Sequence, residues 1–262
     1  MNLEIGPREL ANTLKDRLGD RRLVVFLDYD GTLSQIVQHP AYAVLDEPTR
    51  RVLAGVAAVH PVYVISGRDL DDVRERVAVE GIYCVGSHGF QMPEAAPGID
   101  PLALEEAAYE LRSAADELEQ WLDYIDGVVI ERKRYSFALH YRMVDRDDLK
   151  QIHAAAADVL ERYGSVTSKR GKQVIEFIPD IPWDKGLCLQ ALMARLDDSD
   201  DARPLFPMYI GDDVTDEDAF RVLDPATGMS VVVAEDERDS AAEFRLSGVP
   251  AVRAFLEELI RP

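Results

Sequence analysis

The sequence has little cysteine, no long apolar run and a deficit of positive charge, and each excludes a class of protein. Its 262 residues include two cysteines, Cys84 and Cys188, both in apolar surroundings, which predicts buried reduced thiols and no disulfide framework. No apolar segment approaches the length that crosses a bilayer, and the N-terminus carries early charges where a signal peptide would be apolar. We therefore expect a cytoplasmic protein with no membrane partner.

Acidic residues outnumber basic ones by 49 to 29, which gives a formal net charge of −20. Nucleic acids and anionic membranes bind positive surfaces, so the sequence predicts neither as a partner. If the substrate is itself an anion, local positive charge must overcome this overall field. Since 47% of the residues are hydrophobic, the chain can bury one large core or two modest ones. We expect it to be a monomer.

Strand-like and helix-like segments alternate in the first and last parts of the chain. Residues 22–30, "RLVVFLDYD", are continuously apolar and β-branched before the acids, which is typical of a buried parallel strand. The alternation predicts an α/β, Rossmann-like parallel sheet with helices on both faces. The predicted strands are 22–30, 61–68, 81–89, 206–213 and 229–235, and the predicted helices are 47–59, 69–78 with Asp69 as its N-cap, 184–196, 215–223 and 251–260.

Between residues 97 and 180 the pattern changes. Long helices and short strands occur there in an order typical of a small α+β domain with an antiparallel sheet. The sequence therefore predicts a parallel-sheet core, residues 1–96 and 181–262, split by an inserted α+β domain, residues 97–180. The predicted elements of the insert are helix 101–125, strands 127–134 and 135–144, helix 146–164 and a hairpin over 165–179 that turns near Gly171.

Polar residues follow several predicted strands at the point where each strand ends. Open parallel sheets bind their ligands at this edge. So many gathered carboxylates are costly unless a cation joins them, and oxygen ligands favour Mg²⁺. The residues are Asp28 and Asp30 after the first strand, Ser66-Gly67-Arg68 after the second, Ser87-His88-Gly89 after the third and Gly211-Asp212-Asp213 after a later one, with Lys185 at the start of a helix.

Strand spacing lets Asp28 and Asp30 project toward the same side. One carboxylate can attack phosphorus while the other handles the proton of the leaving oxygen, and an aspartyl-phosphate is a known covalent strategy. Mg²⁺ and Lys185 would keep the nucleophile ionised. Ser66 and the backbone N–H groups after Gly31 can donate hydrogen bonds to the phosphoryl oxygens.

Three other interpretations of "DYDGT" are open. A Ca²⁺ loop has its glycine at position six, whereas Gly31 comes fourth and follows a strand. A D-x-D metal-diphosphate clamp of glycosyltransferases leaves Ser66 and Lys185 unexplained. An ordinary Asp-Gly turn accounts for the tetrapeptide alone. In the phosphoryl-transfer interpretation, Gly31 lets the backbone come close to the substrate and Thr32 braces the loop.

Four motifs resemble those of the haloacid-dehalogenase superfamily of phosphatases, and the resemblance covers the whole chain. They are "DYDGTL", "VISGR", the lysine of "WDKG" and "GDDVTDED". With "GSHGFQM", "KRYSFALHYR" and "GKQVIEFIP", the sequence further resembles the trehalose-6-phosphate phosphatase family. The resemblance implies Mg²⁺-dependent hydrolysis of trehalose 6-phosphate through an aspartyl-phosphate, the last step of trehalose biosynthesis.

The resemblance also implies roles for residues of the core. Asp28 would be the nucleophile and Asp30 the acid/base. Mg²⁺ would be held by Asp28, the backbone carbonyl of Asp30 and Asp212. Asp213 and Asp216 would fix the lysine or metal-bound waters. The alternative for Asp216 and the two acids after it is capping of a helix N-terminus.

Substrate contacts are expected from several core residues. The resemblance implies that Ser66 and Lys185 bind the phosphoryl group, and we expect Gly67 and Arg68 to lie beside it. His88 ends the third predicted strand, so it can contact the substrate or merely satisfy backbone groups.

The insert resembles a cap that closes over the sugar. Trehalose offers hydroxyl groups, and Lys172 and Glu176 share a predicted strand face that can bind them, unless they form an exposed cross-strand pair. Lys133, His140 and Arg142 lie in other cap strands; His140 and Arg142 are expected on one face, and Arg142 can equally be a structural clamp.

Two further functions fit the same sequence. The family often carries a basic residue where this chain has Ile178, and caps of this kind also serve other sugar phosphates, such as sucrose or mannosylglycerate phosphates. The other alternative is a non-catalytic sugar-phosphate sensor. A sensor would be favoured by loss of the nucleophile or the lysine, but Asp28 and Lys185 are both present.

Overall fold

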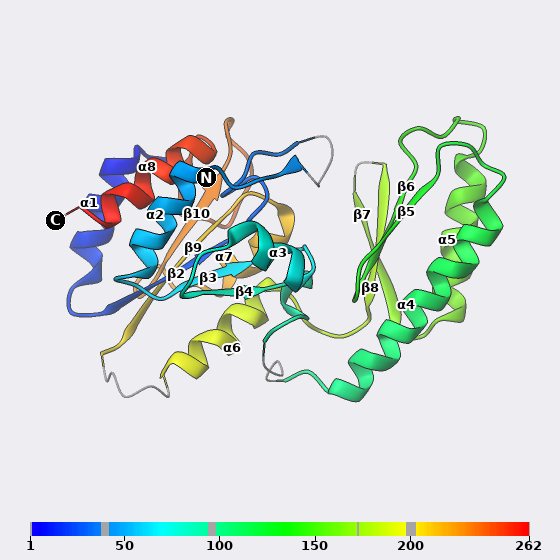
Figure 1. Ribbon diagram of the computed structural model, residues 1–262, viewed down its shortest axis with the longest axis horizontal. Helices are drawn as coiled ribbons and strands as arrows, with labels where there is room; N and C mark the ends of the chain where they lie inside the picture. The colour runs from blue at the N-terminus through cyan, green and yellow to red at the C-terminus, as the bar shows by residue number, and fades with distance from the viewer. Residues whose placement is uncertain (1, 38–41, 94–97, 172, 198–202, 262) are drawn as a thin grey trace. The chain divides into compact units, whose positions relative to one another are not determined.

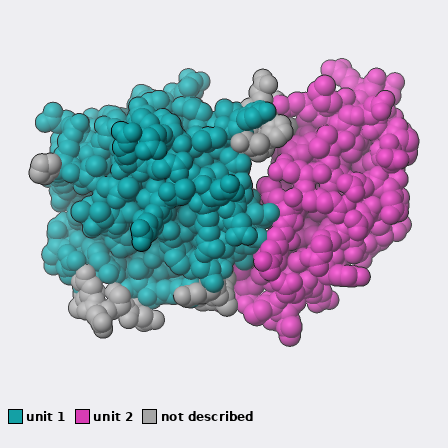
Figure 2. Space-filling model, in the orientation of Figure 1, with its two compact units in different colours: residues 1–96, 183–262 teal, residues 97–182 magenta. Residues whose placement is uncertain are grey.

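The chain folds into two compact units. The core unit comprises Met1–Ala96 and Trp183–Pro262, and the insert unit comprises Pro97–Pro182 (Figure 2). The insert unit ends two residues later than the sequence predicts. The computed structural model describes residues 2–37, 42–93, 98–171, 173–197 and 203–261.

The core unit is built on one parallel sheet of seven strands, in the order β1-β11-β10-β9-β2-β3-β4 (Figure 1). β2 pairs with β9 on one side and β3 on the other, so the strand that carries the two aspartates lies inside the sheet. The predicted α/β parallel-sheet fold is confirmed. The strands are β1 Leu3–Glu4, β2 Arg22–Leu27, β3 Val62–Ile65, β4 Ile82–Val85, β9 Leu205–Gly211, β10 Met229–Val233 and β11 Phe244–Leu246.

Helices cover both faces of this sheet, which explains why β2 is apolar throughout. Leu23, Val25 and Leu27 join a cluster with α1, α2, α3 and α8, whereas Val24 and Phe26 join a second cluster with α6 and α7. None of these five side chains is more than 3% exposed, so each contributes about 2 kcal/mol of burial. The helices are α1 Pro7–Leu18, α2 Glu47–Ala57, α3 Leu70–Val77, α6 Lys185–Asp197, α7 Glu217–Val222 and α8 Val249–Leu259.

The start of α3 is tied to the loop after β4. Asp69 occupies the N-cap position as predicted, but it forms no side-chain cap hydrogen bond. Its carboxylate instead accepts hydrogen bonds from Ser87 Oγ and Gln91 Nε2, each at 3.2 Å. The N–H of Leu70 donates to Gln91 Oε1. Two loops at the carboxyl edge of the sheet are therefore held together.

The insert unit packs two helices on one face of a four-stranded antiparallel sheet, in the order β5-β6-β8-β7 (Figure 1). Phe137 and Phe177 stack with ring centroids 4.4 Å apart and form the core with side chains of both helices. Alternate residues such as His140 and Glu176 lie on the opposite face of the sheet. The elements are α4 Pro101–Leu122, β5 Val129–Arg132, β6 Phe137–His140, α5 Leu149–Arg162, β7 Val166–Gly171 and β8 Val174–Pro179.

Some elements differ from the sequence prediction. α1, β1 and β11 were not predicted, and β6 ends at His140, four residues earlier than expected. Cys84 and Cys188 are free and buried, as predicted. Among the described residues, no helix has the length and apolar character needed to cross a membrane.

Candidate active site

A buried ion-pair cluster lies at the carboxyl edge of the parallel sheet. Asp28 directly follows β2, Lys185 is the first residue of α6, and Asp216 ends a short 3₁₀ helix, η3 (Val214–Asp216), before α7. Lys185 Nζ lies 2.6 Å from Asp28 Oδ1 and 2.7 Å from Asp216 Oδ1. Three elements distant in sequence thus bring two carboxylates to one ammonium group.

Asp216 holds the lysine in place. Its Oδ1 also accepts a hydrogen bond of 2.7 Å from the buried Tyr209 hydroxyl, and its Oδ2 accepts one of 2.9 Å from the N–H of Asp213. Burial disfavours the charged ammonium, but Asp216 and Asp28 outweigh it and raise the pKa of Lys185. Lys185 is therefore a fixed positive charge.

The cluster contains more negative charge than Lys185 balances. Asp28, Asp212 and Asp216 each offer a carboxylate oxygen, and these oxygens all lie within 4.8 Å of one another. Burial raises the pKa of Asp28 well above its usual range against the pull of Lys185. The pKa of Asp212 is raised to about 7, mainly by burial and next by the negative charge of Asp216. A divalent cation would relieve this repulsion, and the all-oxygen donor set fits Mg²⁺.

The loop after β2 is shaped around Asp212. Gly31 has φ +84°, and a Cβ there would come within 2.1 Å of Asp212 Oδ2, so a side chain is excluded by both backbone and space. Thr32 Oγ1 donates to Asp212 Oδ1 at 3.2 Å. Gly31 and Thr32 were predicted at the substrate; the structure places both against Asp212.

The Asp30 carboxylate points to an arginine. Arg68 Nε and Nη2 donate to its two oxygens at 2.6 and 2.7 Å, and Arg68 Nη1 donates to Asp72 at 2.8 Å. The Arg68 guanidinium also lies 5.5 Å from the Tyr29 ring centroid. Arg68 was expected beside the substrate, and these contacts turn it toward Asp30.

Ser66, Gly67 and His88 lie together at the ends of β3 and β4. Ser66 is buried; its Oγ accepts a hydrogen bond from the N–H of Arg68, and its carbonyl accepts one from the N–H of His88. A Cβ on Gly67 would lie 2.6 Å from His88 Cε1. Ser87 and His88 both have positive φ, 48° and 55°, a conformation that costs energy and clusters at functional sites.

Three predicted cap residues lie in the insert unit. Lys133 Nζ is 4.0 Å from Glu176 Oε1, and His140 Nε2 is 3.1 Å from Glu131 Oε2. Glu176 lies on β8, an inner strand, opposite Ala138 of β6 on one side and Lys169 of β7 on the other. It therefore stands near the middle of the sheet. The face opposite the helices therefore carries charged side chains, although Lys133 itself follows β5.

Two predictions in this unit need separate mention. Because β6 ends at His140, Arg142 lies exposed in the following turn, and the prediction that it shares a strand face with His140 is wrong. Lys172 lies outside the described residues. Ile178 follows Glu176 by two residues on β8, so both side chains are on the same face.

Sequence comparison decides the family. A sequence model of the trehalose-phosphatase family matches residues 26–250. The chain belongs to the trehalose-phosphatase family. Among its relatives are the trehalose-phosphate phosphatases of Mycobacterium tuberculosis, 42% identical over 253 residues, and Mycobacterium marinum, 41% identical over 257 residues. The matches cover 95% and 93% of this chain.

This family member spans only part of its relatives. It covers 64% and 63% of those two phosphatases. An uncharacterized glycosyl hydrolase of Mycobacterium tuberculosis is 42% identical over 259 residues, which are 96% of this chain and 19% of that protein. The matched region is therefore a part of longer proteins in each case.

Solved structures agree with the family's fold. The C-terminal domain of C. albicans trehalose-6-phosphate phosphatase has a TM-score of 0.78 at 24% identity, covering 99% of both chains. The C-terminal domain of Candida albicans trehalose synthase regulatory protein has a TM-score of 0.70 at 14% identity, covering 98% of this chain and 99% of that one. At such identities the likeness establishes the fold alone.

Two residues of the cluster in this trehalose-phosphatase family member were missed by sequence reasoning. Tyr209 lies in the apolar strand β9, where its one polar atom was the only signal. Arg238 follows β10 and donates hydrogen bonds to the Asp212 carbonyl and to Glu217. It belongs to none of the four motifs, so nothing in the sequence indicated it.

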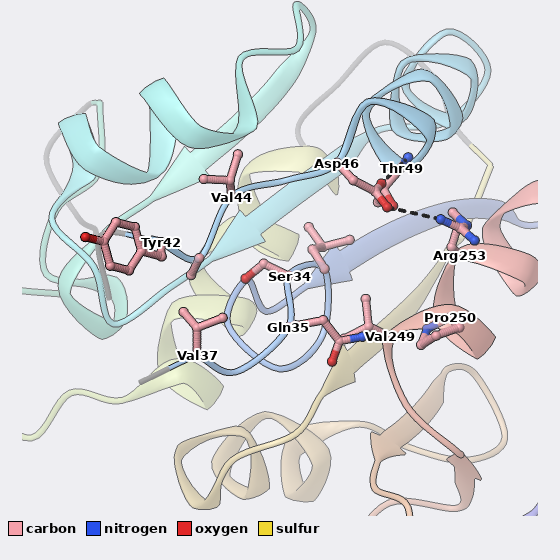
Figure 3. Close-up of a pocket in the computed structure, with 12 residues that line it drawn as sticks. Ser34, Gln35, Val37, Tyr42, Val44, Asp46, Thr49, Val249, Pro250 and Arg253 are labelled. Carbon is pink, nitrogen blue, oxygen red and sulfur yellow. Dashed lines mark hydrogen bonds and ion pairs between the residues drawn. The ribbon is translucent and has the colours of Figure 1, made fainter. Parts of the chain in front are cut away.

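The core unit also has a pocket, shown in Figure 3. It lies between the segment that begins at Leu33, the last residue of the first motif, and the start of α8, and Asp46 and Arg253 form an ion pair of 3.1 Å at it. None of the predicted site residues lines it. The pocket and the acidic cluster therefore share no predicted site residue.

Proposed function

We propose that the chain is a Mg²⁺-dependent phosphatase that hydrolyses trehalose 6-phosphate to trehalose and phosphate. The observation that carries this proposal is the Asp28 carboxylate, paired with Lys185 at 2.6 Å and grouped with Asp212 and Asp216 within 4.8 Å. Membership of the trehalose-phosphatase family supports the choice of substrate.

The first half-reaction transfers the phosphoryl group to the enzyme. A carboxylate oxygen of Asp28 attacks phosphorus, the bond from phosphorus to the sugar oxygen breaks, and Asp30 gives its proton to that oxygen as trehalose leaves. Lys185 and the Ser66 hydroxyl stabilise charge on the phosphoryl oxygens. A bound Mg²⁺ would neutralise carboxylate and phosphoryl charge; Asp28, Asp212 and the Asp30 carbonyl would hold it, with Asp216 near enough to contribute.

The second half-reaction regenerates the carboxylate. Asp30 accepts a proton from water as the water oxygen attacks phosphorus of the aspartyl-phosphate. The bond between phosphorus and Asp28 breaks, and phosphate departs. Asp216 and Tyr209 do not bind the phosphoryl group in this mechanism. Their role is to keep Lys185 in place through both steps.

The insert unit acts as the cap in this proposal. Lys133, His140 and Glu176 offer charged donors and acceptors that match the hydroxyl groups of a disaccharide, and we assign Lys172 to the same role. Closure over the sugar would exclude bulk water and select the substrate. We assign Arg142, which lies exposed in the turn after β6, to this role as well.

Phosphate release from a panel of sugar phosphates tests the proposal. Trehalose 6-phosphate should give the highest kcat/KM, activity should vanish with chelator and return with Mg²⁺, and Asp28→Asn should lower kcat by roughly 10⁴-fold or more. Far-UV circular dichroism of that variant should match the wild type. Equal turnover of glucose 6-phosphate and trehalose 6-phosphate would remove the substrate assignment, and full activity in chelator would remove the metal.

Ile178 favours one alternative. It is an apolar residue two positions from Glu176 on the same sheet face, where the family often has a basic one, so the cap can suit another sugar phosphate. The panel should therefore include sucrose 6-phosphate and mannosylglycerate phosphate. If Asp28→Asn keeps the biological function of the wild type, the chain is instead a sugar-phosphate sensor.

A further inference from the structure

Arg238 lies on the loop after β10 and reaches the turn between β9 and α7. Its Nη1 donates to the backbone carbonyl of Asp212, and its Nη2 lies 3.3 Å from Glu217 Oε1. Asp212 directly follows β9 and Glu217 is the first residue of α7. One guanidinium group therefore holds both ends of the turn 212–217.

The Arg238 loop is itself fixed in position. Glu217, whose side chain is 7% exposed, accepts a second hydrogen bond of 2.7 Å from the N–H of Ala241. Asn2 Nδ2 donates to the backbone carbonyl of Arg238 at 3.1 Å. Charge-assisted hydrogen bonds to a buried carboxylate are strong, and the planar guanidinium group holds its two donor nitrogens in a fixed geometry toward the Asp212 carbonyl and Glu217. These two contacts of Arg238, which we call the brace, therefore depend on the geometry of its side chain as well as on its charge.

We propose that Arg238 is a positioning residue for the divalent-cation site. The turn that it braces carries Asp212 and Asp216, two of the three carboxylates that meet within 4.8 Å. Fixing the backbone at both ends of the turn keeps these two within reach of Asp28. Arg238 acts through Asp212, and the inference rests on the divalent cation of the proposed function.

Charge and positioning predict opposite effects of Arg238 on cation binding. A positive side chain near a cation site repels the cation, so its removal would tighten binding if charge alone mattered. Loss of the brace would instead weaken binding, because residues that orient metal ligands contribute about 10- to 100-fold in affinity. The sign of the change separates the two.

Cation titration tests the inference. Mg²⁺ binding by calorimetry and Mn²⁺ binding by electron paramagnetic resonance should give a Kd about 10- to 100-fold higher for both Arg238→Ala and Arg238→Lys than for the wild type. Arg221→Ala is the matched control: Arg221 is exposed on α7 and pairs with Asp218, so the same loss of charge should leave Kd within about twofold.

Activity provides a second readout, since a purely structural defect would not respond to metal. The Mg²⁺ concentration for half-maximal hydrolysis should rise with Kd, and excess Mg²⁺ should restore kcat to within a few-fold of the wild type. Unchanged or tighter cation binding by Arg238→Lys overturns the inference. A kcat that excess Mg²⁺ does not restore also overturns it. Should Arg238→Ala fail to fold, the Arg238→Lys variant alone decides the test. A wild type that binds the cation without hydrolysing trehalose 6-phosphate contradicts the proposed function and leaves the Kd comparison valid.

Discussion

At the scale of single residues, the pairing of Asp30 with Arg68 has the most direct consequence for catalysis. Arg68 takes both carboxylate oxygens of Asp30 in a fork, and the Arg68 side chain is only 10% exposed. A bidentate pair fixes orientation as well as position. In the proposed mechanism, Arg68 therefore fixes the position of the acid/base carboxylate of Asp30 before substrate arrives.

Comparing substrates whose leaving groups differ in their need for a proton tests this role of Arg68. We expect Arg68→Ala to lower kcat/KM for trehalose 6-phosphate by roughly 100-fold, because departure of an alcohol needs a well-placed proton donor. The kcat/KM for p-nitrophenyl phosphate should fall by only a few-fold, since its leaving group needs little protonation. Initial rates on the two substrates measure this, and kcat/KM excludes the later water step.

Arg68→Lys provides the control. This variant keeps the charge but replaces the planar fork with a single ammonium group. Its kcat/KM for trehalose 6-phosphate should therefore be closer to that of Arg68→Ala than to that of the wild type. An equal loss on both substrates in either variant would mean that Arg68 is only structural.

At the scale of secondary-structure elements, a row of alternating charges runs from the residue before the N-cap of α3 along the helix. Arg68, Asp72 and Arg76 are spaced by four residues, and Asp72 accepts hydrogen bonds of 2.8 Å from both arginines. Burial opposes ionisation of Asp72, but the hydrogen bonds from Arg76 and Arg68 outweigh it and hold its pKa below the usual range. The helix thereby supports the position of Arg68.

Asp72→Asn should lower the free energy of unfolding by about 1 kcal/mol at neutral pH, a small value because Asp72 is partly exposed and solvent screens the pair. A lowered folded-state pKa stabilises the fold above the unfolded-state value of about 3.9 and loses this effect as pH falls through the folded-state pKa. The gap between variant and wild type should thus be constant above about pH 4 and shrink below it.

Urea unfolding across this pH range measures the gap. Asp71→Asn, which removes a charge from the exposed neighbouring position, should cost only a few tenths of a kcal/mol. A gap for Asp72→Asn that persists unchanged in acid would contradict the ion-pair explanation.

The sequence predicted those elements whose pattern is strong. The apolar run before Asp28 indicated a buried strand, and the polar residues after β2 and β9 indicated a site at the carboxyl edge. β1 and β11 were missed, because two or three residues are too few to show a period. Asp69 was predicted as a cap by its position alone, but Ser87 and Gln91, distant in sequence, compete for its carboxylate.

The same limit applies to the site. Asp28, Lys185 and Asp212 follow from motifs, since each stands in a distinctive local pattern. Arg238 and Tyr209 do not, because their roles come from contacts across the fold. The contact of Arg68 with Asp30 was likewise invisible, since it depends on a side-chain orientation that strand spacing does not specify.

At the scale of the whole molecule, each of the two units has hydrophobic clusters of its own. The core unit has its own clusters on both sheet faces, and the insert unit has a separate cluster around Phe137 and Phe177. Under the proposed function, variants on the sheet face opposite the insert's helices should therefore change substrate selection without disturbing the fold around Asp28.

Glu176→Gln should raise KM for trehalose 6-phosphate by roughly 10- to 100-fold, because charged hydrogen bonds contribute about 1.5–3 kcal/mol. Its kcat/KM for p-nitrophenyl phosphate should stay within about twofold, since that substrate lacks the sugar. Glu119→Gln, a like change on α4 at an exposed ion pair with Arg132, should affect neither. Equal effects of Glu176→Gln on both substrates would contradict the assignment of this face to the sugar.

The stereochemical course at phosphorus tests most directly that Asp28 receives the phosphoryl group. Hydrolysis of an isotopically chiral thiophosphate ester of trehalose in labelled water, with Mg²⁺ present, should give retention of configuration. Two successive in-line displacements, by Asp28 and then by water, each invert the centre. Inversion would mean that water attacks the substrate directly, and it would contradict the role of Asp28 as the nucleophile.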